Sequence, residues 1–286
     1  MDRHPDAWIA RRTLFDGPLF EIGHVICRPT PDLRTEVEAA SFHVLALTTA
    51  GVWALHEGPR RHVVATPNDA VFISAGQSHR VSFPGHVGDQ AMTVRITPEG
   101  LGRLAPHANA ITTRTVLSAK GILSRATLMR TLIRFPDPLL IEELTVGLLD
   151  STLNSVKPLK SGSLHVERVK EAISTSPERR WTLGELSGTA GISPCHLAHV
   201  FQDEVGTSVY RYAVRLRLAV ALNAVLDSNA DITTIALDAG FASHSHFTAR
   251  FRAFFGFTPD ALRRTTRSGK AAELRKIVTA PLAAAA

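Results

Sequence analysis

The segment from Gly240 to Arg264, GFASHSHFTARFRAFFGFTPDALRR, combines six phenylalanines with a pair of arginines at its end. Between positions 241 and 270, six basic residues stand against one acidic residue, Asp260, so the local charge is +5. The basic residues are Arg250, Arg252, Arg263, Arg264, Arg267 and Lys270. Basic side chains that neutralise phosphates supply most of the non-specific affinity of proteins for nucleic acids. The segment therefore predicts contact with a polyanion.

A helical wheel separates the two kinds of side chain in this segment. On a helix over 244–255, four phenylalanines fall at i, i+4, i+7 and i+8 and share one face, which we expect to be core. These are Phe247, Phe251, Phe254 and Phe255. The opposite face carries small or polar side chains that fit into a groove, namely Ser245, His246, Ala249 and Arg252.

The same skeleton occurs twice in the C-terminal region. ELSGTAGISPCHLAHVF (185–201) and IALDAGFASHSHFTARF (235–251) each place an Ala-Gly pair, an apolar residue and a serine before a new helix. Glycine supplies the backbone angles of a tight turn, and serine caps the following helix. The two glycines stand 49 positions apart, at 191 and 240. This repetition predicts two helix-turn-helix units, at about 182–203 and 231–254.

In the first copy, the second helix is expected at about 194–203. Its apolar residues point inward on the wheel, namely Leu197, Val200 and Phe201. Its outward residues are polar, namely Cys195, His199 and Gln202, with His196 beside them. Both second helices are therefore candidates to enter a groove of a duplex.

The stretch 207–229 has few helix breakers and predicts one long helix between the two copies. About 20 residues give roughly 30 Å, close to the ~34 Å between successive major grooves on one face of a duplex. Such a spacer would let two helices read adjacent grooves. We expect phosphate contacts from five arginines, although a solvated face is an equal alternative for the first two. These are Arg211, Arg215, Arg252, Arg263 and Arg264.

Composition sets broad limits on the class of protein. The chain of 286 residues is 44% hydrophobic and 20% charged, which is typical of a globular protein. A net charge of +6 suits a polyanionic partner, and equally suits a mildly basic protein without one. We expect no membrane span and no secretory signal. Two cysteines are too few for a disulfide framework, so we expect a cytoplasmic protein.

The chain divides into expected segments by pattern. Residues 1–115 contain β-branched and aromatic runs broken by Gly, Pro and Asn, which predicts a β-barrel or sandwich. Residues 116–158 change to a helical pattern, in which Leu140, Leu144 and Leu148 form a stripe. The stripe could be a dimer seam or could pack on the N-terminal domain, and we favour the seam. The remaining expected segments are a linker at 159–164, a helical domain at 165–267 and a tail at 268–286.

The residues of the C-terminal region resemble the AraC/XylS family of bacterial transcription regulators. The family signature is matched at Gly240, Phe241, Ser243, Ser245, Phe247, Phe251, Phe255, Gly256, Thr258, Pro259 and Arg263. The resemblance covers about 165–267 and implies a domain with two helix-turn-helix units that binds DNA. One departure is Ala249, which stands where the family often has arginine, so a direct contact from arginine to guanine is in doubt in this copy.

The resemblance, together with the wheels, assigns a set of DNA-binding residues. From the first copy they are Ser193, Pro194, Cys195, His196, Ala198, His199 and Gln202. From the second copy they are Ser243, His244, Ser245, His246, Thr248, Ala249, Arg250, Arg252, Arg263 and Arg264. Because Cys195, Ala198 and His199 are short or weakly hydrogen-bonding, we expect the first helix to read DNA shape and thymine methyl groups.

The resemblance also implies an N-terminal regulatory domain, often cupin-like. PNDAVFISAGQSH (67–79) is similar to the second cupin motif, with Asp69, Gly76 and His79 in register. The ligands of a cupin metal site are missing, so we expect no metal, no cofactor and no catalytic residues. Residues that could bind an effector are His43, Trp53, Arg61, His79 and Arg80, although we favour a structural role for each.

The sequence thus predicts an α+β protein of two domains, a cupin-like β-barrel or sandwich with trailing helices followed by an all-α double helix-turn-helix domain. We expect a cytoplasmic, nucleoid-associated activator that is not an enzyme. Its expected partners are double-stranded DNA, a small-molecule effector, RNA polymerase and a second copy of the chain. Two alternatives stay open: a cupin-type metalloenzyme, an isomerase or oxygenase, fused to a DNA-binding module, and a regulator whose N-terminal domain only dimerises.

Overall fold

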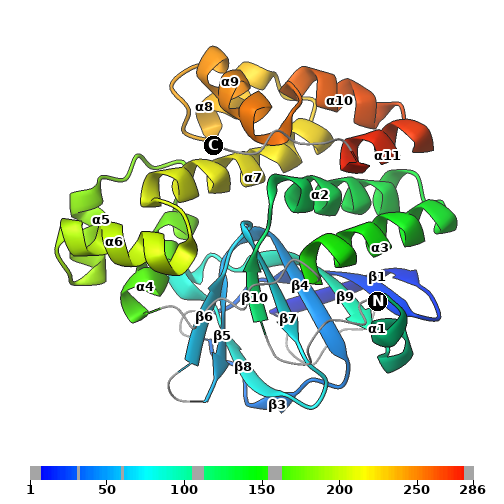
Figure 1. Ribbon diagram of the computed structural model, residues 1–286, viewed down its shortest axis with the longest axis horizontal. Helices are drawn as coiled ribbons and strands as arrows, with labels where there is room; N and C mark the ends of the chain where they lie inside the picture. Colours follow the sequence, from blue (N-terminus) through cyan, green and yellow to red (C-terminus); the bar gives the residue numbers. More distant parts are fainter. Residues whose placement is uncertain (1–7, 31–32, 59–60, 105–112, 154–162, 280–286) are drawn as a thin grey trace.

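The computed structural model describes residues 8–30, 33–58, 61–104, 113–153 and 163–279. A β-rich N-terminal part is followed by two long helices and then by a helical C-terminal region (Figure 1). The predicted fold class, α+β with an N-terminal β unit and a C-terminal all-α unit, is confirmed. No helix in these described ranges is long and apolar enough to cross a bilayer.

The N-terminal strands form two antiparallel sheets. The larger has the order β1-β2-β9-β4-β7-β10, with bounds β1 Ile9–Asp16, β2 Phe20–Cys27, β9 Asp89–Ile96, β4 His43–Gly51, β7 Asp69–Ile73 and β10 Thr113–Val116. The smaller has the order β3-β8-β5-β6, with bounds β3 Glu38–Ala39, β8 Ser78–Ser82, β5 Trp53–Glu57 and β6 Arg61–Ala65. Short helices at Pro84–His86 (η1) and Pro98–Leu104 (α1) flank β9.

The central strands of the larger sheet are buried on both faces. Leu45 and Leu47 of β4 pack in the cluster that includes the helices after the sheet, whereas Ala46 packs with Trp53 and Val71 in the core between the sheets. Successive strand residues point to opposite faces, so a strand covered on both sides needs apolar residues at consecutive positions. This explains why the sequence of β4 is almost continuously apolar.

Helices α2 (Ala119–Arg134) and α3 (Pro138–Leu153) cover the outer face of the larger sheet (Figure 1). The expected leucine stripe of α3 is buried here: Leu140, Leu144 and Leu148 are 2%, 3% and 0% exposed and join the same core cluster as the sheet. Our preference for a dimer seam at this stripe is therefore wrong. The leucines pack within the chain, in the apolar core that they share with the outer face of the sheet.

Eight helices follow among the described residues of the C-terminal region. Their bounds are α4 Leu164–Thr175, α5 Leu183–Ala190, α6 Pro194–Val205, α7 Val209–Asp227, α8 Ile232–Asp238, α9 His244–Phe255, α10 Pro259–Arg267 and α11 Ala271–Thr279. The last lies in the segment expected only as a tail. It is held by Leu274 and Ile277, which are buried in the central core, and by an ion pair of 2.7 Å between Arg275 and Glu143 of α3.

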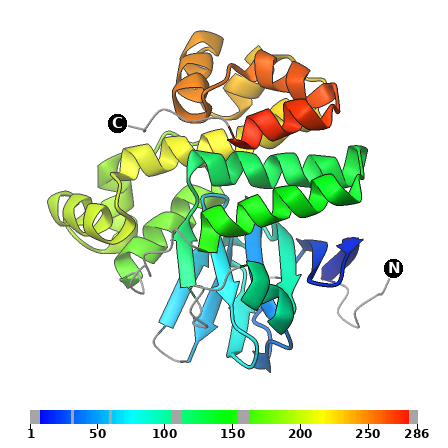
Figure 2. The ribbon, with the colours of Figure 1, turned by 45° about the vertical axis from the view of Figure 1, so that its right-hand side comes forward.

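The two expected helix-turn-helix units are α5–α6, called the first unit, and α8–α9, called the second unit. The first unit has its own core with α4 and the start of α7, built around residues such as Leu197 and Phe201. The core of the second unit is continuous with the cluster under α2 and α3. Figure 2 shows this layering, with the second unit above α7 and α2, and the sheets below.

A buried group of four charged residues, called the charge cluster, fastens α4 to the sheets. It consists of Asp69, Arg114, Glu167 and Lys170, whose side chains are at most 3% exposed. Arg114 Nη1 donates to Glu167 Oε1 at 2.6 Å, and Lys170 Nζ lies 3.5 Å from Glu167 Oε2 and 3.6 Å from Asp69 Oδ2. Backbone groups of Val64 complete the network: its N–H donates to Glu167 at 2.7 Å and its carbonyl accepts from Lys170 at 2.6 Å.

Electrostatics of the charge cluster follow from its burial. Burial alone would raise the pKa of Glu167, but Lys170 and Arg114 outweigh it, and the pKa lies below its usual value. Burial and the charge of Arg114 lower the pKa of Lys170. Two positive and two negative side chains balance each other, so the group is neutral as a whole. Such a network tolerates burial only while every member keeps its partner.

Candidate nucleic-acid interface

Turn and cap residues build the first unit as the sequence predicted. Gly191 ends α5 with φ of 71°, a left-handed conformation that glycine adopts without cost. The Ser193 side chain then accepts from the backbone N–H of His196 at 3.3 Å, and Pro194 occupies the first helical position. At the other end of this unit, Thr182 and Glu185 form a capping box at the start of α5.

The second unit has the same turn and serine cap, and its turn packs more closely against a neighbouring loop. Ser243 accepts from the N–H of His246 at 3.2 Å and begins α9. Gly240 has φ of 77°, and a Cβ at this position would lie 2.1 Å from the carbonyl oxygen of Glu178. The turn of the second unit therefore packs against the loop before α5, and only glycine fits there.

Replacing either cap serine is expected to lower the stability of the chain. Ser193→Ala or Ser243→Ala leaves a first-turn N–H without its acceptor, which costs about 1 kcal/mol of unfolding free energy. Urea titration followed by circular dichroism measures the difference. Ser245→Ala is the matched control, because Ser245 is exposed inside α9 and caps nothing. Equal stability of the cap variants and the control would contradict this role of the serines.

The exposed face of α6 contains the residues expected to point outward. All seven first-copy candidates, Ser193, Pro194, Cys195, His196, Ala198, His199 and Gln202, are exposed. Their helix is held from below by Leu197 and Phe201, which are both fully buried. His199 Nδ1 donates to the Cys195 carbonyl at 2.8 Å, which leaves its Nε2 directed away from the backbone. The face thus offers an imidazole nitrogen and an amide.

The exposed face of α9 is more basic. Ser243, His244, Ser245, Ala249, Arg250 and Arg252 are exposed, whereas His246 and Thr248 are half-buried. His246 lies edge-on against Phe241 with ring centroids 5.6 Å apart, and Arg250 Nε donates to His246 Nε2 at 3.5 Å. Phe247, Phe251 and Phe255 are 0% exposed, as expected from the wheel. These three phenylalanines are therefore core, Phe254 is partly buried against it, and the two arginines of α9 face solvent.

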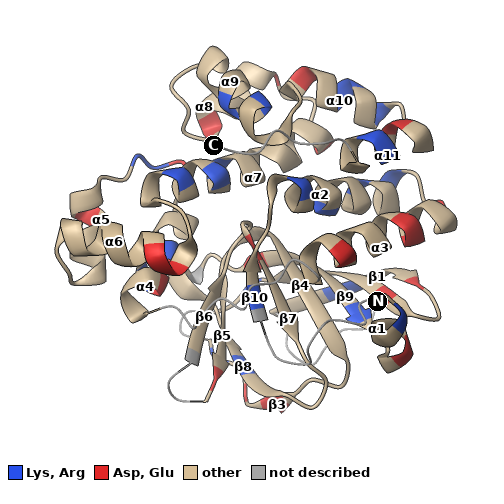
Figure 3. Cartoon of the chain, in the orientation of Figure 1, with Lys and Arg blue, Asp and Glu red and all other residues tan. Residues whose placement is uncertain are grey.

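Charge differs between the two candidate reading helices. Arginines lie on α9 at Arg250 and Arg252, whereas α6 has no lysine or arginine and carries Asp203 and Glu204 near its end (Figure 3). Positive residues continue from α9 onto α10 and α11 (Figure 3). A helix without positive charge gains little from phosphates, so the second unit offers the stronger phosphate surface.

Two of the five arginines expected at phosphates are engaged within the chain. Arg215 Nη2 donates to the Leu117 carbonyl at 2.7 Å, and its guanidinium lies 5.4 Å from the centre of the Phe254 ring. Arg263 donates to the carbonyls of Val225 and Ala230, both at 2.9 Å. The other three, Arg211, Arg252 and Arg264, are exposed.

Sequence reasoning missed Arg217, which joins the two units. From α7, its guanidinium donates to the carbonyls of Pro177 and Arg179 at 2.7 and 2.6 Å and to that of Gly240 at 3.4 Å. One side chain thus binds the loop before α5 and the turn before α9. The available signal was the spacing of RYAVRLR: Arg211 and Arg215 are four residues apart and share a face of the helix, whereas Arg217, two residues further on, must point to a different side.

The effector candidates make separate contacts. His43 accepts from the N–H of Ala75 at 3.3 Å and stacks on Phe72. The Trp53 indole is buried and donates to Thr48 at 2.9 Å. His79 is 8% exposed and lies 3.8 Å from Glu38, and Arg80 is exposed.

The side chain of Arg61 falls outside the described part of the structure. In that part, no group of three or more His, Cys, Asp or Glu side chains is placed to hold a metal.

Comparison with known proteins matches the same region. Residues 186–265 match a family model described as a helix-turn-helix domain. The HTH-type transcriptional regulator GlxA of Rhizobium meliloti is 36% identical over 101 residues, which cover 35% of this chain and 31% of GlxA. ExsA of Pseudomonas aeruginosa, also an HTH-type transcriptional regulator, is 31% identical over 100 residues, 35% of this chain and 36% of ExsA.

Among solved structures, a transcriptional regulator with an AraC-type DNA-binding domain from Chromobacterium violaceum is 24% identical. The match covers 36% of this chain and 91% of that one, with a TM-score of 0.35. The chain spans between 31% and 40% of the length of the first four curated relatives.

Proposed function

We propose, from the AraC-type helix-turn-helix domain that residues 186–265 form, that the chain is a sequence-specific DNA-binding transcription regulator. The observation that carries the proposal is the pairing of two capped units with exposed second helices across α7. That helix has 19 residues, or about 28 Å, slightly less than the ~34 Å between successive major grooves. In our proposal α6 and α9 enter adjacent grooves, and the DNA bends toward the protein to meet both.

The two helices have different roles in this proposal. Arg252 of α9 and Arg264 of α10 bind phosphates on either side of the second groove, because both are exposed and positive. On α6, the Gln202 amide can pair with adenine, His199 can accept or donate at a base edge, and Ala198 can contact a thymine methyl group. Sequence reading by the first unit therefore depends on a few short contacts and on DNA shape.

The remaining parts of the proposal concern partners. We place residues 165–267 in the DNA-binding domain and residues 1–115 in a cupin-like effector or dimerisation domain, with 116–158 as the helical segment. Most of the expected linker, 159–164, lies outside the described residues, and the expected tail, 268–286, includes the packed helix α11. The curated relatives GlxA and ExsA are named as transcriptional regulators, which supports a cytoplasmic regulator rather than an enzyme. A second copy of the chain, a small-molecule effector and RNA polymerase complete the expected partners of an activator.

Selection of bound sites from random duplex DNA tests the function. The full chain is used, because the core of the second unit is continuous with α2 and α3, and a fragment from residue 163 would expose that core. We expect a motif with two short blocks about one helical turn apart. Recovery of a motif with one block would mean that only one of the two units reads the DNA sequence. No binding by a folded full chain would overturn the proposal.

Salt dependence tests the phosphate role of α9. Arg252→Gln is expected to weaken binding nearly equally across sequences and to reduce the slope of log affinity against log salt by about 1. Fluorescence anisotropy of a labelled duplex at several salt concentrations gives the slope. Arg103→Gln is the control, because Arg103 is exposed on α1, far from α9, and forms an ion pair with Glu99. An unchanged slope for Arg252→Gln would remove this arginine from the interface.

A further inference from the structure

A cleft of about 590 Å³ lies between the two helix-turn-helix units. Its floor is the N-terminal half of α7, with Val209, Ala213 and Val214. One wall is formed by the first unit and the loop before it, and the other by Gly240, Ala242 and His246 of the second unit. We call this space the interunit cleft. Its volume is in the range of small-molecule sites, roughly 300–1,000 Å³.

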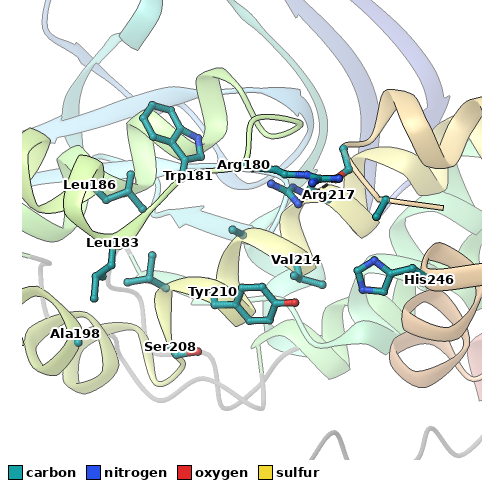
Figure 4. Close-up of a pocket in the computed structure, with 14 residues that line it drawn as sticks. Arg180, Trp181, Leu183, Leu186, Ala198, Ser208, Tyr210, Val214, Arg217 and His246 are labelled. Atoms are coloured by element: carbon teal, nitrogen blue, oxygen red, sulfur yellow. Dashed lines mark hydrogen bonds between the residues drawn. The ribbon is translucent and has the colours of Figure 1, made fainter. Parts of the chain in front are cut away.

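Most of the lining is apolar and part of it is aromatic. Trp181 and Leu183 come from the first wall, and Tyr210 and Val214 rise from α7 between the walls (Figure 4). The side chains of Leu183 and Tyr210 are 40% and 60% exposed. They therefore leave apolar surface open at the cleft. Apolar surface that remains open between two rigid units favours a ligand with a flat hydrophobic body.

The charge in the cleft has one sign. Arg180 and Arg217 lie together between Trp181 and His246 (Figure 4), and among the described residues no aspartate or glutamate lines the cleft. In the described part of the chain, the hydrogen bonds of Arg217 go to backbone carbonyls. These neutral acceptors satisfy its N–H donors but do not neutralise its charge. Burial, and then the nearby charge of Arg180, lower the pKa of Arg217, whereas Tyr210 and Glu178 oppose that shift. An anion beside these guanidinium groups would relieve their repulsion.

We propose that the interunit cleft binds a small organic anion with a flat apolar body, such as an aromatic carboxylate or sulfonate. The rings would lie against Trp181, Leu183 and Val214, and the acidic group would face Arg180 and Arg217. This site goes beyond the proposed function, and it differs from the effector site expected in the N-terminal domain, where the candidate residues make separate contacts.

Occupation of the cleft has a consequence for DNA binding that rests on the proposed function. Ala198 of α6 and His246 of α9 both line the cleft and both belong to the candidate DNA-binding surface. A molecule wedged between the units would fix their separation and extend toward the DNA. We therefore expect the anion to weaken DNA binding, and DNA to weaken binding of the anion by the same factor.

Two dyes that share one ring system test the site on the full chain without DNA. The anionic probe is 8-anilinonaphthalene-1-sulfonate, and the neutral probe is N-phenyl-1-naphthylamine, which lacks the sulfonate. Fluorescence titration is expected to give one saturable site for the sulfonate, with an affinity at least roughly tenfold higher than that of the neutral dye, because one charge-assisted contact is worth about that factor. Equal affinities for the two dyes would overturn the proposal of an anion site.

Two matched pairs of variants locate the dye. Arg180→Gln is expected to weaken sulfonate binding roughly tenfold, whereas Arg211→Gln, also exposed near the start of α7 but outside the cleft, leaves it unchanged. Ala198→Phe places a ring in the cleft from an exposed helical position and is expected to abolish binding, whereas Ala249→Phe on exposed α9 surface does not. Normal binding by Ala198→Phe would place the dye elsewhere and overturn the proposal.

A separate titration tests the consequence for DNA. With a duplex recovered by selection, sulfonate dye at a concentration that saturates the wild-type site is expected to weaken DNA binding of the wild-type chain more than that of Arg180→Gln, each measured relative to the same protein without dye. Dye binding that leaves DNA affinity unchanged would overturn the regulatory role and keep the site. Failure of all duplexes to bind would count against the proposed function, while the dye titrations would still decide the site.

Discussion

Glu167→Gln is expected to lower the unfolding free energy of the full chain by about 3–5 kcal/mol, because it breaks a buried ion network. Glu167 is 0% exposed and accepts from Arg114, from the Val64 N–H and from Lys170. In the variant, the glutamine NH2 group would face Arg114, the Val64 N–H or Lys170, all of which are donors and cannot accept a hydrogen bond. Asp69 would then be the only carboxylate left in the charge cluster to balance two buried positive charges.

A second substitution tests the electrostatic cause. Lys170→Met in the Glu167→Gln background restores charge balance, with Arg114 and Asp69 as the remaining pair. We expect the double variant to be more stable than Glu167→Gln alone by about 1 kcal/mol or more, since an uncompensated charge costs more than a lost pair. Urea unfolding curves give all four corners of the cycle. Additive losses would show that packing, and not charge balance, determines the cost.

A control on the same helix separates this effect from general damage to α4. Glu171 lies one turn after Glu167 and is half-buried, outside the charge cluster. Glu171→Gln is expected to change stability by no more than about 0.5 kcal/mol. A similar loss from both glutamates would indicate that α4 tolerates no substitution, and the charge cluster would lose its special role.

The charge cluster also links the proposed DNA-binding domain to the sheets. Asp69 and Arg114 come from β7 and β10, whereas Glu167 and Lys170 come from α4, which supports the first unit. The second unit reaches the same N-terminal part through the core under α2 and α3. Both units are thus held by one scaffold, so a change in that scaffold can alter the separation of α6 and α9.

Much of the C-terminal region could be predicted because its signals are local. Ser193 and Ser243 cap helices, Gly191 and Gly240 turn the chain, and the phenylalanines of α9 share one face at helical spacing. Each of these features depends on residues within about two turns of each other. The predicted reading helices, about 194–203 and 244–255, accordingly coincide with α6 and α9 within two residues at each end.

The rest depended on contacts between distant segments. The helical spacing of Leu144 fits both a dimer seam and an intrachain core, and only the position of the sheet shows that it is core. Glu167 and Lys170 have the polarity of a solvated helix face, and only the approach of Arg114 and Asp69 explains their burial. Tyr210 and Arg180 carry no motif, since the interunit cleft exists only when the two units are positioned along α7.

Asp89→Asn is expected to change how the stability of the chain depends on pH. Asp89 is 7% exposed at the start of β9, where it pairs with Cys27 of β2 and Gly51 of β4. Burial raises the pKa of Asp89 from 3.8 to about 7, although a hydrogen bond with Cys27 opposes the shift. Between these two values the folded chain keeps a proton that the unfolded chain has lost, so stability falls as pH rises.

The expected size follows from about 1.4 kcal/mol for each pH unit within that interval. Between pH 5 and pH 8, ionisation of Asp89 should lower the unfolding free energy of the wild type by about 2–3 kcal/mol. Asparagine does not titrate, so the Asp89→Asn variant should not show this loss. His24, His56 and His62 have pKa values lowered mainly by burial, so their contribution changes in the opposite direction. The relevant quantity is therefore the difference between variant and wild type at each pH.

Urea unfolding of both proteins at pH 5, 6, 7 and 8 measures that difference. It should grow in favour of Asp89→Asn by about 2–3 kcal/mol across the series. Asp16→Asn, at the exposed end of β1, is the control and should give a constant difference. A constant difference for Asp89→Asn would mean that Asp89 is ionised in the folded chain throughout this range. The start of β9 would then hold a buried charge whose compensation comes from outside the Cys27 contact.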